Sequence, residues 1–173
     1  MRYPVVVRTQ QTRWLSDREQ LAWRAFLTAC QTVLGTVETQ LVRDSDIPHG
    51  YYEILVRLSE TPGRALRMTQ LAEASTSSKS RLSHAVARLE ERGWVKRTDC
   101  PTDRRGQVAQ LTDEGYAALA AAAPGHVEQV RRSLFDHLTT EQVEQLLQIS
   151  TAIVAAADPG QVADTGCCPS DPG

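Results

Sequence analysis

The sequence predicts a mainly α-helical fold with one small β-hairpin, and three observations carry this prediction. Segments near both ends of the chain repeat apolar residues at steps of three and four, the period of an α-helix. In the middle, two helical segments are joined by the polar link "STSS", the pattern of a helix-turn-helix. The strand-like runs "WVKRT" and "QVAQLT" flank the loop "TDCPTDRRG" and predict a hairpin, or wing. The expected fold is therefore a winged helix-turn-helix flanked by N- and C-terminal helices.

The first helix is expected from Ser16 to about residue 43. Ser16 followed by Glu19 fits a capping box, which marks a helix start. The apolar stripe that follows is so broad that a partner helix, or a second chain, is needed to cover it. This stripe consists of Trp23, Phe26, Cys30, Val33 and Val37, and it is widened by Leu27, Leu34 and Leu41.

The middle of the chain predicts three shorter helices and a brief strand. A helix at residues 51–59 ends at "TPG", and "ALRM" follows as the strand. "TQLAEAS" predicts a short helix with Thr69 as its N-cap, and "TSSKSRLSHAVARLEERG" predicts a longer one closed by Gly93. The inward face of the longer helix consists of Leu82, Val86 and Leu89 with Ala85 at its edge, and the outward face of Ser77, Ser80, Arg81, His84, Ala87 and Arg88.

Two helices are expected at the C-terminal end. Thr112 opens a long helix that Pro124 and Gly125 kink or interrupt before it ends near residue 137. Thr139 with Gln142 forms a second capping box and opens the last helix. The expected organisation is an arm at residues 1–15, a helix at 16–47, the helix-turn-helix and wing at 48–112, helices at 113–157 and a flexible tail at 158–173.

Length and composition bound the class of protein. A chain of 173 residues suits one domain with accessory helices. No apolar run approaches the roughly 20 residues needed to cross a bilayer, and the N-terminal apolar stretch is too short for a secretory signal. The expectation is a cytoplasmic protein. No Cys-x-x-Cys pair is present among the four cysteines, so neither a metal site nor a cofactor is expected.

Charge is unevenly distributed along the chain. Residues 61–106 hold 10 of the 19 Lys and Arg residues but only 5 of the 21 Asp and Glu residues. The rest of the chain, with 9 basic and 16 acidic residues, has a net charge of −7. A basic segment in an acidic chain favours contact with a localised polyanion, because a phosphate-binding surface acts through its own field.

The polyanion that fits this pattern is double-stranded DNA. A helix whose outward face mixes small residues with hydrogen-bond donors is able to enter the major groove, where arginine pairs with guanine. An arginine in a hairpin beside that helix is attracted to the narrow minor groove, and Asp103 can brace the guanidinium of Arg105. A solvated polar face and a turn-forming Asp103 are the alternatives. The candidate DNA-binding residues are Ser77, Ser78, Lys79, Ser80, Arg81, His84, Arg88, Asp103, Arg104 and Arg105.

Residues 89–115, "LEERGWVKRTDCPTDRRGQVAQLTDEG", contain "LxxRGWV", "DRRG" and "LTxEG" in this order and spacing. With these motifs the chain resembles the MarR family, the multiple-antibiotic-resistance type of winged-helix transcriptional regulators. A weaker resemblance in helix pattern extends over about residues 14–157. Asp103 and Arg105 match the Asp-x-Arg of the family's wing, in which the arginine enters the minor groove. His84 departs from the arginine of many members, and Pro124 departs from the pattern of the long dimerisation helix.

The resemblance implies a homodimer whose N- and C-terminal helices interlock, so residues 16–47 and 113–157 are expected to be dimerisation helices. It also implies binding to a pseudo-palindromic operator, usually to repress a gene, and release by a small aromatic or phenolic ligand or by an oxidant. The family's pocket lies between the dimer lobe and the winged helix. The candidates for stacking on such a ligand are Trp14, Trp23, His49, Tyr51 and Tyr52, with core packing as the alternative.

A redox-sensing role through Cys30 is an alternative, because some members sense oxidants through a cysteine in the first helix. Cys30 lies in an apolar stripe without a nearby cation, which favours an inert thiol. Cys100 is expected to be exposed in the wing, and the role of Cys167 and Cys168 stays open. His126 and His137 are interpreted as solvated surface residues that are too far apart for a metal pair.

Two other classes of function compete with a DNA-binding regulator. A winged-helix protein–protein interaction module would use the same basic face for an acidic partner. An enzyme would need a catalytic constellation, such as Cys100 with His84 or His126. No Gly-x-Ser-x-Gly elbow, phosphate loop or metal signature is present, so the chain is not expected to be an enzyme.

Overall fold

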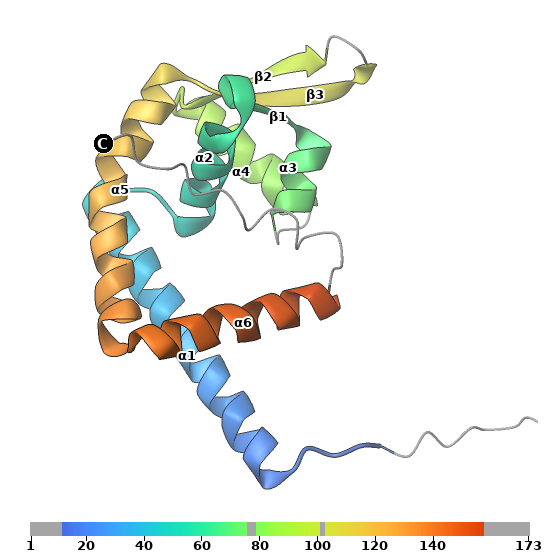
Figure 1. Cartoon of the computed structure of the whole chain (residues 1–173). Coiled ribbons are helices and arrows are strands. Elements are labelled where there is room, and N and C mark those ends of the chain that lie inside the picture. Colours follow the sequence, from blue (N-terminus) through green and yellow to red (C-terminus); the bar gives the residue numbers. More distant parts are fainter. Residues whose placement is uncertain (1–11, 76–78, 101–102, 158–173) are drawn as a thin grey trace, which may run out of the picture.

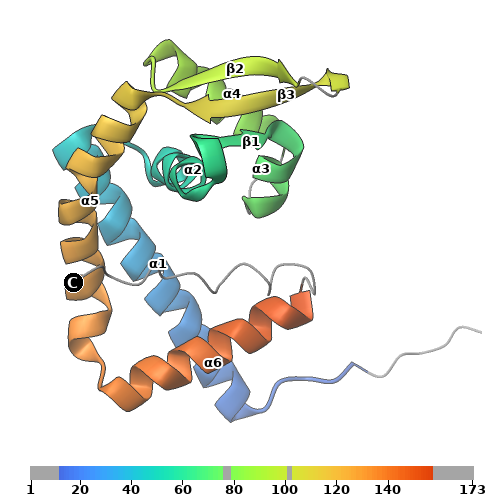
Figure 2. The ribbon, with the colours of Figure 1, turned by 45° about the horizontal axis from the view of Figure 1, so that its top comes forward.

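The structure is a computed structural model that describes residues 12–75, 79–100 and 103–157 (Figure 1). Two long helices, α1 (Asp17–Ser45) and α5 (Asp113–Ser133), lie side by side in Figures 1 and 2 and carry a winged unit at one end. That unit contains α2 (His49–Glu60), α3 (Met68–Ala74) and α4 (Lys79–Glu91), together with a small sheet. The last helix, α6 (Thr140–Ala157), turns away from α5 after the 3-10 turn Phe135–His137.

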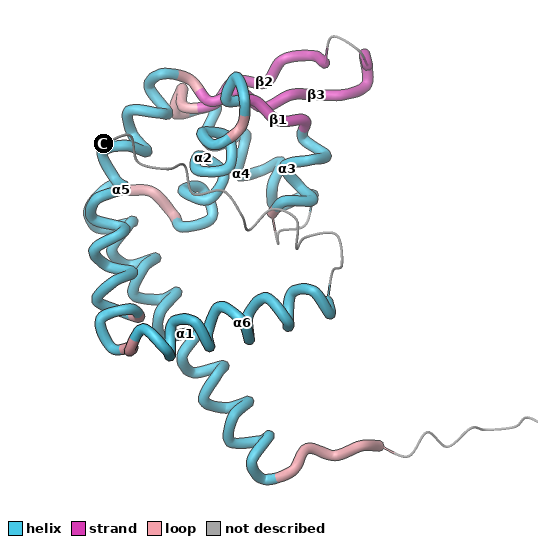
Figure 3. The backbone as a smooth tube through the Cα atoms, viewed as in Figure 1, coloured by secondary structure: helices cyan, strands magenta, loops and turns pink. Residues whose placement is uncertain are grey.

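The sheet has three antiparallel strands in the order β1-β3-β2 (Figure 3). They are β1 (Ala65–Arg67), β2 (Val95–Cys100) and β3 (Asp103–Leu111), and the 3-10 turn Pro62–Arg64 precedes β1. The pairing of β2 with β3 forms the wing. A mainly helical fold with a small hairpin is thus confirmed, and the brief strand expected at "ALRM" is confirmed as β1.

Both predicted capping boxes are present. At the start of α1, Glu19 donates its backbone N–H to Ser16 Oγ (3.3 Å), and Ser16 donates its own N–H to Glu19 Oε2 (2.7 Å). At the start of α6, Gln142 N–H donates to Thr139 Oγ1 (3.2 Å), and Thr139 N–H donates to Gln142 Oε1 (2.9 Å). These local patterns fixed the helix starts correctly because the cap needs only residues three positions apart.

Other predicted boundaries were wrong. Thr69 is not the N-cap of α3, because β1 runs directly into the helix and the cap is Arg67, whose N–H donates to Gln70 Oε1 (3.2 Å). Helix α2 begins at His49, two residues before the expected start. Pro124 does not interrupt α5, which continues to Ser133 and ends before the expected residue 137. Pro124 is exposed, and a helix tolerates a missing backbone donor better on its solvent side.

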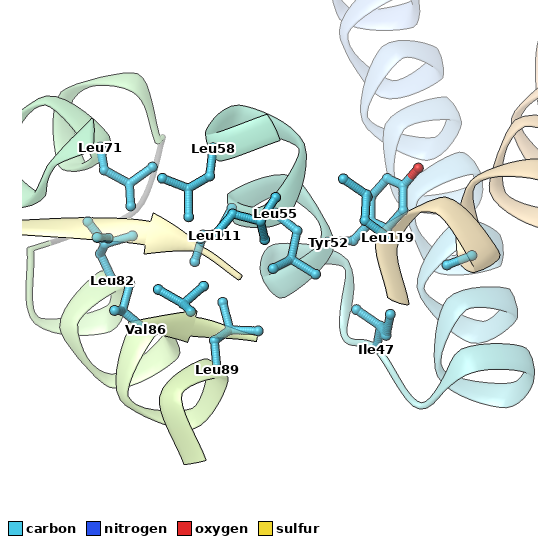
Figure 4. Close-up of a cluster of buried hydrophobic side chains, with 14 of the residues drawn as sticks. Ile47, Tyr52, Leu55, Leu58, Leu71, Leu82, Val86, Leu89, Leu111 and Leu119 are labelled. Atoms are coloured by element: carbon cyan, nitrogen blue, oxygen red, sulfur yellow. The ribbon is translucent and has the colours of Figure 1, made fainter. Parts of the chain in front are cut away.

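The hydrophobic core lies within the winged unit and extends toward α5 (Figure 4). Leu82, Val86 and Leu89 are buried on one face of α4, as the sequence predicts. They pack with leucines of the neighbouring elements, so one side of α4 is held inward while the other faces outward. The other labelled core residues in Figure 4 are Ile47, Tyr52, Leu55, Leu58, Leu71, Leu111 and Leu119.

A tight backbone junction joins the end of α4 to the start of α5. We call Gly93, Trp94, Thr112 and Gly115 the Trp94 junction. Gly93 has a φ of 73°, a left-handed conformation that glycine adopts readily. The Trp94 carbonyl accepts the N–H of Thr112 (3.0 Å), and the Thr112 hydroxyl donates to the carbonyl of Gly93 (2.7 Å). The same hydroxyl oxygen accepts the N–H of Gly115 (3.0 Å) and caps α5.

The long helices leave a large apolar surface uncovered. The apolar stripe of α1 is buried only toward its C-terminal end, at Val37 and Leu41. None of the helices in the described ranges is long and apolar enough to cross a membrane. The exposed large apolar residues of α1 and α6 are Leu21, Trp23, Phe26, Leu27, Leu34, Val42, Leu147, Ile149, Ile153 and Val154.

Replacement of Gly115 by alanine tests the Trp94 junction. A Cβ atom at this position would overlap the Trp94 carbonyl oxygen and lie 2.8 Å from Leu111 Cδ1. We expect Gly115→Ala to lower the free energy of unfolding by about 3 kcal/mol in denaturant titrations. Gly50→Ala is the matched control, because a Cβ atom there has nothing within 4 Å. Equal stability of the two variants would contradict the close contact.

Candidate nucleic-acid interface

The outward face of α4 gathers four of the predicted DNA-binding residues. Ser80, Arg81, His84 and Arg88 are all exposed on this helix, and Ala87 beside them is half-buried. The buried side of α4 packs on the core, so the two faces of the helix are separated as the sequence predicts. Ser77 and Ser78 lie outside the described residues, and Lys79 is the first residue of α4. The face combines a small hydroxyl, an imidazole and two guanidinium groups.

Arg88 shares this face with a carboxylate. Its Nη1 donates to Glu91 Oε2 (2.7 Å), and this hydrogen bond raises the pKa of Arg88 above its usual value. The two side chains are 66% and 61% exposed. A solvent-exposed ion pair of this kind contributes little to stability, because water and salt screen it. Arg88 can therefore leave Glu91 and pair with a phosphate or a base at little cost in free energy.

The wing projects beyond the helices (Figures 1 and 2). Its register runs from the pair Val95↔Leu111 to Cys100↔Asp103, with an irregularity between Asp99 and Cys100. The backbone of Asp103, Arg104 and Arg105 belongs to β3. The side chains of these three residues and of Cys100 lie outside the described part of the chain, so their predicted roles stay predictions.

An ion pair that the sequence analysis missed joins α4 to the wing. Glu90 in the last turn of α4 accepts the backbone N–H of Arg97 on Oε1 (2.9 Å) and its Nε–H on Oε2 (2.6 Å). The guanidinium Nη2 also contacts Oε2. The sequence does contain a signal for this pair. A glycine turn between a helix and a strand brings residues on either side of it together, and Glu90 and Arg97 lie seven positions apart on either side of Gly93.

Two further arginines of the basic segment brace the winged unit. Arg92 donates to the Asp46 carbonyl (2.6 Å) and to Asp46 Oδ2 (2.9 Å), and its guanidinium lies 5.0 Å from the Trp94 ring centroid. Arg64 pairs with Asp113 (3.2 Å) and lies 3.9 Å from the Tyr116 ring centroid. With the pairs of Arg88 and Arg97, at least four of the ten basic residues at 61–106 have carboxylate partners within the part of the chain that the structure describes. The charge count alone therefore overstates the positive surface.

Comparison with known proteins assigns the chain to a family. The MarR family model matches residues 47–106. The chain is 33% identical over 104 residues to the transcriptional regulator HosA from Escherichia coli O111:H-, a match that covers 60% of this chain and 75% of that relative. The chain belongs to the MarR family. This family comprises transcriptional regulators rather than enzymes.

Two solved MarR family structures are similar over most of the chain. Sco3205, a MarR family transcriptional regulator from Streptomyces coelicolor crystallised in complex with DNA, is 50% identical, with a TM-score of 0.82. The match covers 85% of this chain and 92% of Sco3205. AbsC, a MarR family regulator from the same organism, is 41% identical with a TM-score of 0.80, and the match covers 87% of this chain and all of AbsC. The fold described above is thus a MarR fold.

The residues predicted to line the MarR effector pocket do not lie together. Trp14 precedes α1 and is 84% exposed, and Trp23 on α1 stacks on Phe26 with ring centroids 6.3 Å apart. Tyr51 lines a pocket of about 190 Å³ between α2 and α4, which also includes Arg81. Only His49 and Tyr52 share a site. The five predicted residues are therefore divided over four places.

His126 of α5 completes the site of His49 and Tyr52. Its ring centroid lies 4.4 Å from that of Tyr52 and 6.2 Å from that of His49. The interpretation of His126 as a solvated surface residue is wrong, because α2 covers it; His137 is exposed as expected. Burial lowers the pKa of His126, the nearby His49 lowers it further, and burial raises the pKa of Tyr52.

Two polar atoms near this site are buried without a partner in the described part of the chain. They are Nδ1 of His126 and Oε1 of Gln40. Gln40 on α1 is only 4% exposed, and its Nε2 donates to Asp44 Oδ2 (3.1 Å). A Cβ atom added at Gly125, the neighbour of His126, would lie 2.9 Å from Gln40 Nε2. The junction of α1, α2 and α5 therefore holds aromatic surface beside an unused hydrogen-bond acceptor.

The structure describes the side chain of Cys30 but not those of the other three cysteines. Cys30 is half-buried in α1 as a free thiol, and Cys167 and Cys168 lie outside the described residues. Among the residues that the structure describes, no three His, Cys, Asp or Glu side chains are grouped to hold a metal ion.

The lowered pKa of His126 predicts a pH-dependent stability. Because the folded pKa lies below the unfolded value of about 6.5, the unfolded chain binds the proton more readily, and stability falls as the pH drops through that value. We expect His126→Gln to flatten the loss of unfolding free energy between pH 7.5 and 5.5, measured by urea titration. His137→Gln, at an exposed position, should keep the wild-type slope; an unchanged slope in His126→Gln would contradict the burial.

Proposed function

We propose that this chain is a homodimeric DNA-binding transcriptional regulator that acts as a repressor on a pseudo-palindromic operator. The observation that carries this proposal is the pairing of α4, with a donor-rich outward face, and a projecting hairpin on the same unit. It is supported by 50% identity to a MarR family regulator crystallised in complex with DNA. Residues 48–112 would form the DNA-binding region.

In this proposal α4 enters the major groove. Arg81 and Arg88 are the candidates to pair with guanine, and the shorter Ser80 and His84 contact bases or phosphates. Ser77, Ser78 and Lys79 at the start of the helix contact the phosphate backbone, which sets register without reading sequence. The imidazole of His84 contributes a hydrogen-bonding group to this face.

The wing serves the adjacent minor groove. Arg105 is the candidate to enter the groove, where the negative potential of a narrow segment attracts a guanidinium group. Asp103 would hold that group, and Arg104 would contact phosphate. Minor-groove contact outside each recognition helix adds affinity that depends on groove width.

Dimerisation follows from the apolar surfaces of α1 and α6. Many large apolar side chains are exposed on these helices, which is unfavourable in water and favours contact with another chain. Residues 16–47 and 113–157 would supply the interface, as the family likeness implies. A two-fold dimer can then place two α4 helices in successive major grooves, about 10 base pairs apart.

The site of His49, Tyr52 and His126 is the best candidate for an effector. An aromatic ligand would stack on these rings, and a phenolic hydroxyl would donate to the unused Oε1 of Gln40. The site joins α1, α2 and α5, so a ligand that favours one angle between the long helices and the winged unit would change DNA affinity by population shift. Oxidation of Cys30 on α1 is the alternative signal.

The test of DNA recognition is fluorescence anisotropy on the duplex that flanks the protein's own gene, with a scrambled duplex as reference. We expect the wild type to prefer the native duplex at least about a hundredfold. Arg105→Ala should weaken binding and reduce the salt slope by about 1. Arg132→Ala, which removes one exposed charge on α5, should leave the slope unchanged. No binding to either duplex would favour the protein-interaction module instead.

The test of dimerisation is the double variant Ile149→Asp/Ile153→Asp. Both side chains are exposed on one face of α6, so the change should leave the fold of the protomer intact. We expect light scattering to report a monomer with wild-type helical content by circular dichroism, and operator affinity to fall at least about a hundredfold because one half-site remains. A dimer that persists in this variant would exclude this face of α6 from the interface.

A further inference from the structure

We propose that Glu90 is a positioning residue that sets the angle of the wing relative to α4, so that helix and wing contact adjacent grooves together. This inference rests on the proposed function of the chain as a DNA-binding regulator. Glu90 itself need not touch DNA. Its role is exerted through Arg97 and the hairpin that begins two residues before Arg97.

Both oxygens of the Glu90 carboxylate accept hydrogen bonds from one residue of the wing, Arg97. Oε1 accepts the backbone N–H of Arg97 (2.9 Å), and Oε2 accepts the guanidinium Nε–H (2.6 Å). The two side chains are each 27% exposed, less than any side chain in the pairs of Arg64, Arg88 and Arg92. A contact to the main chain fixes the strand itself, whereas a contact between two side chain ends would not.

The position of β2 in the sheet explains why this contact matters. Because the strand order is β1-β3-β2, β2 is an edge strand with a neighbour on one side only. Arg97 pairs in register with Ala109 of β3, which is fully buried. The base of the hairpin is therefore held by the core on its β3 side and by Glu90 on its open side.

A small rotation at this base is amplified along the hairpin. Arg105 lies in β3 four residues before Ala109, toward the tip of the hairpin. Four residues correspond to roughly 13 Å at about 3.3 Å per residue. A rotation of about 10° at the base would move that point by about 2 Å. Hydrogen bonds weaken steeply over such displacements, so the angle of the wing decides whether its contacts form.

Charge alone predicts the opposite effect for this residue. A carboxylate near the proposed DNA surface repels phosphate, so its neutralisation should strengthen binding. Glu91, the next residue, carries the same charge but forms only the exposed pair with Arg88 (2.7 Å). Glu90→Gln and Glu91→Gln therefore remove the same charge at adjacent positions, and only the first alters the hold on the wing.

The experiment compares Glu90→Gln, Glu91→Gln and the wild type on the native flanking duplex and the scrambled duplex. Hydroxyl-radical cleavage reports minor-groove protection by the wing, and dimethyl sulfate reports guanine N7 protection in the major groove by α4. For Glu90→Gln we expect about tenfold weaker binding to the native duplex, no weakening on the scrambled duplex, and loss of the outer hydroxyl-radical protection with the N7 protection retained. Glu91→Gln should keep both protections.

Arg97→Lys provides a second variant if Glu90→Gln folds poorly, as judged by circular dichroism. It keeps the charge and the backbone N–H but removes the Nε contact, so we expect a partial loss of the outer protection. Wild-type outer protection in a folded Glu90→Gln or Arg97→Lys variant would overturn the inference alone. A wild type that does not distinguish the two duplexes would overturn the proposed function, and the inference with it.

Discussion

The carbonyl oxygen of Trp94 lies against the first turn of α5, where only a glycine leaves room for it. Gly115 occupies that position, and the same carbonyl accepts the N–H of Thr112. This contact brings the end of α4, the start of β2 and the start of α5 to one point. Arg92, in the same turn, reaches Asp46 at the C-terminal end of α1. The helix proposed to read DNA is thus tied through one turn to both long helices.

Hydrophobic burial and directional hydrogen bonds stabilise different features of the structure around the Trp94 junction. Burial of apolar side chains from α2, α3, α4 and β3 supplies the driving force that holds the inner face of α4. Hydrophobic burial is non-directional, however, and does not determine the angle at which a hairpin leaves the core. Directional contacts to backbone atoms, such as Glu90 to the Arg97 N–H and Arg92 to the Asp46 carbonyl, supply that angle. The exposed pair of Arg88 and Glu91 has no such role.

The sequence predicted those features that depend on short-range patterns. The capping boxes at Ser16 and Thr139 and the two faces of α4 require only a helical period, and all three were confirmed. The errors arose where tertiary contacts decide. His126, for example, is covered by Tyr52 from another element. The pairs of Glu90 and Arg92 were missed because a charged residue in sequence does not reveal which partner the fold provides.

The most direct test of the central claim, that a two-fold dimer reads DNA with paired α4 helices, is selection of binding sites from a pool of random duplexes by the full-length protein. The account predicts enrichment of an inverted repeat whose half-sites are about 10 base pairs apart, centre to centre. Enrichment of a single unrepeated half-site, or no enrichment above the starting pool, would contradict it.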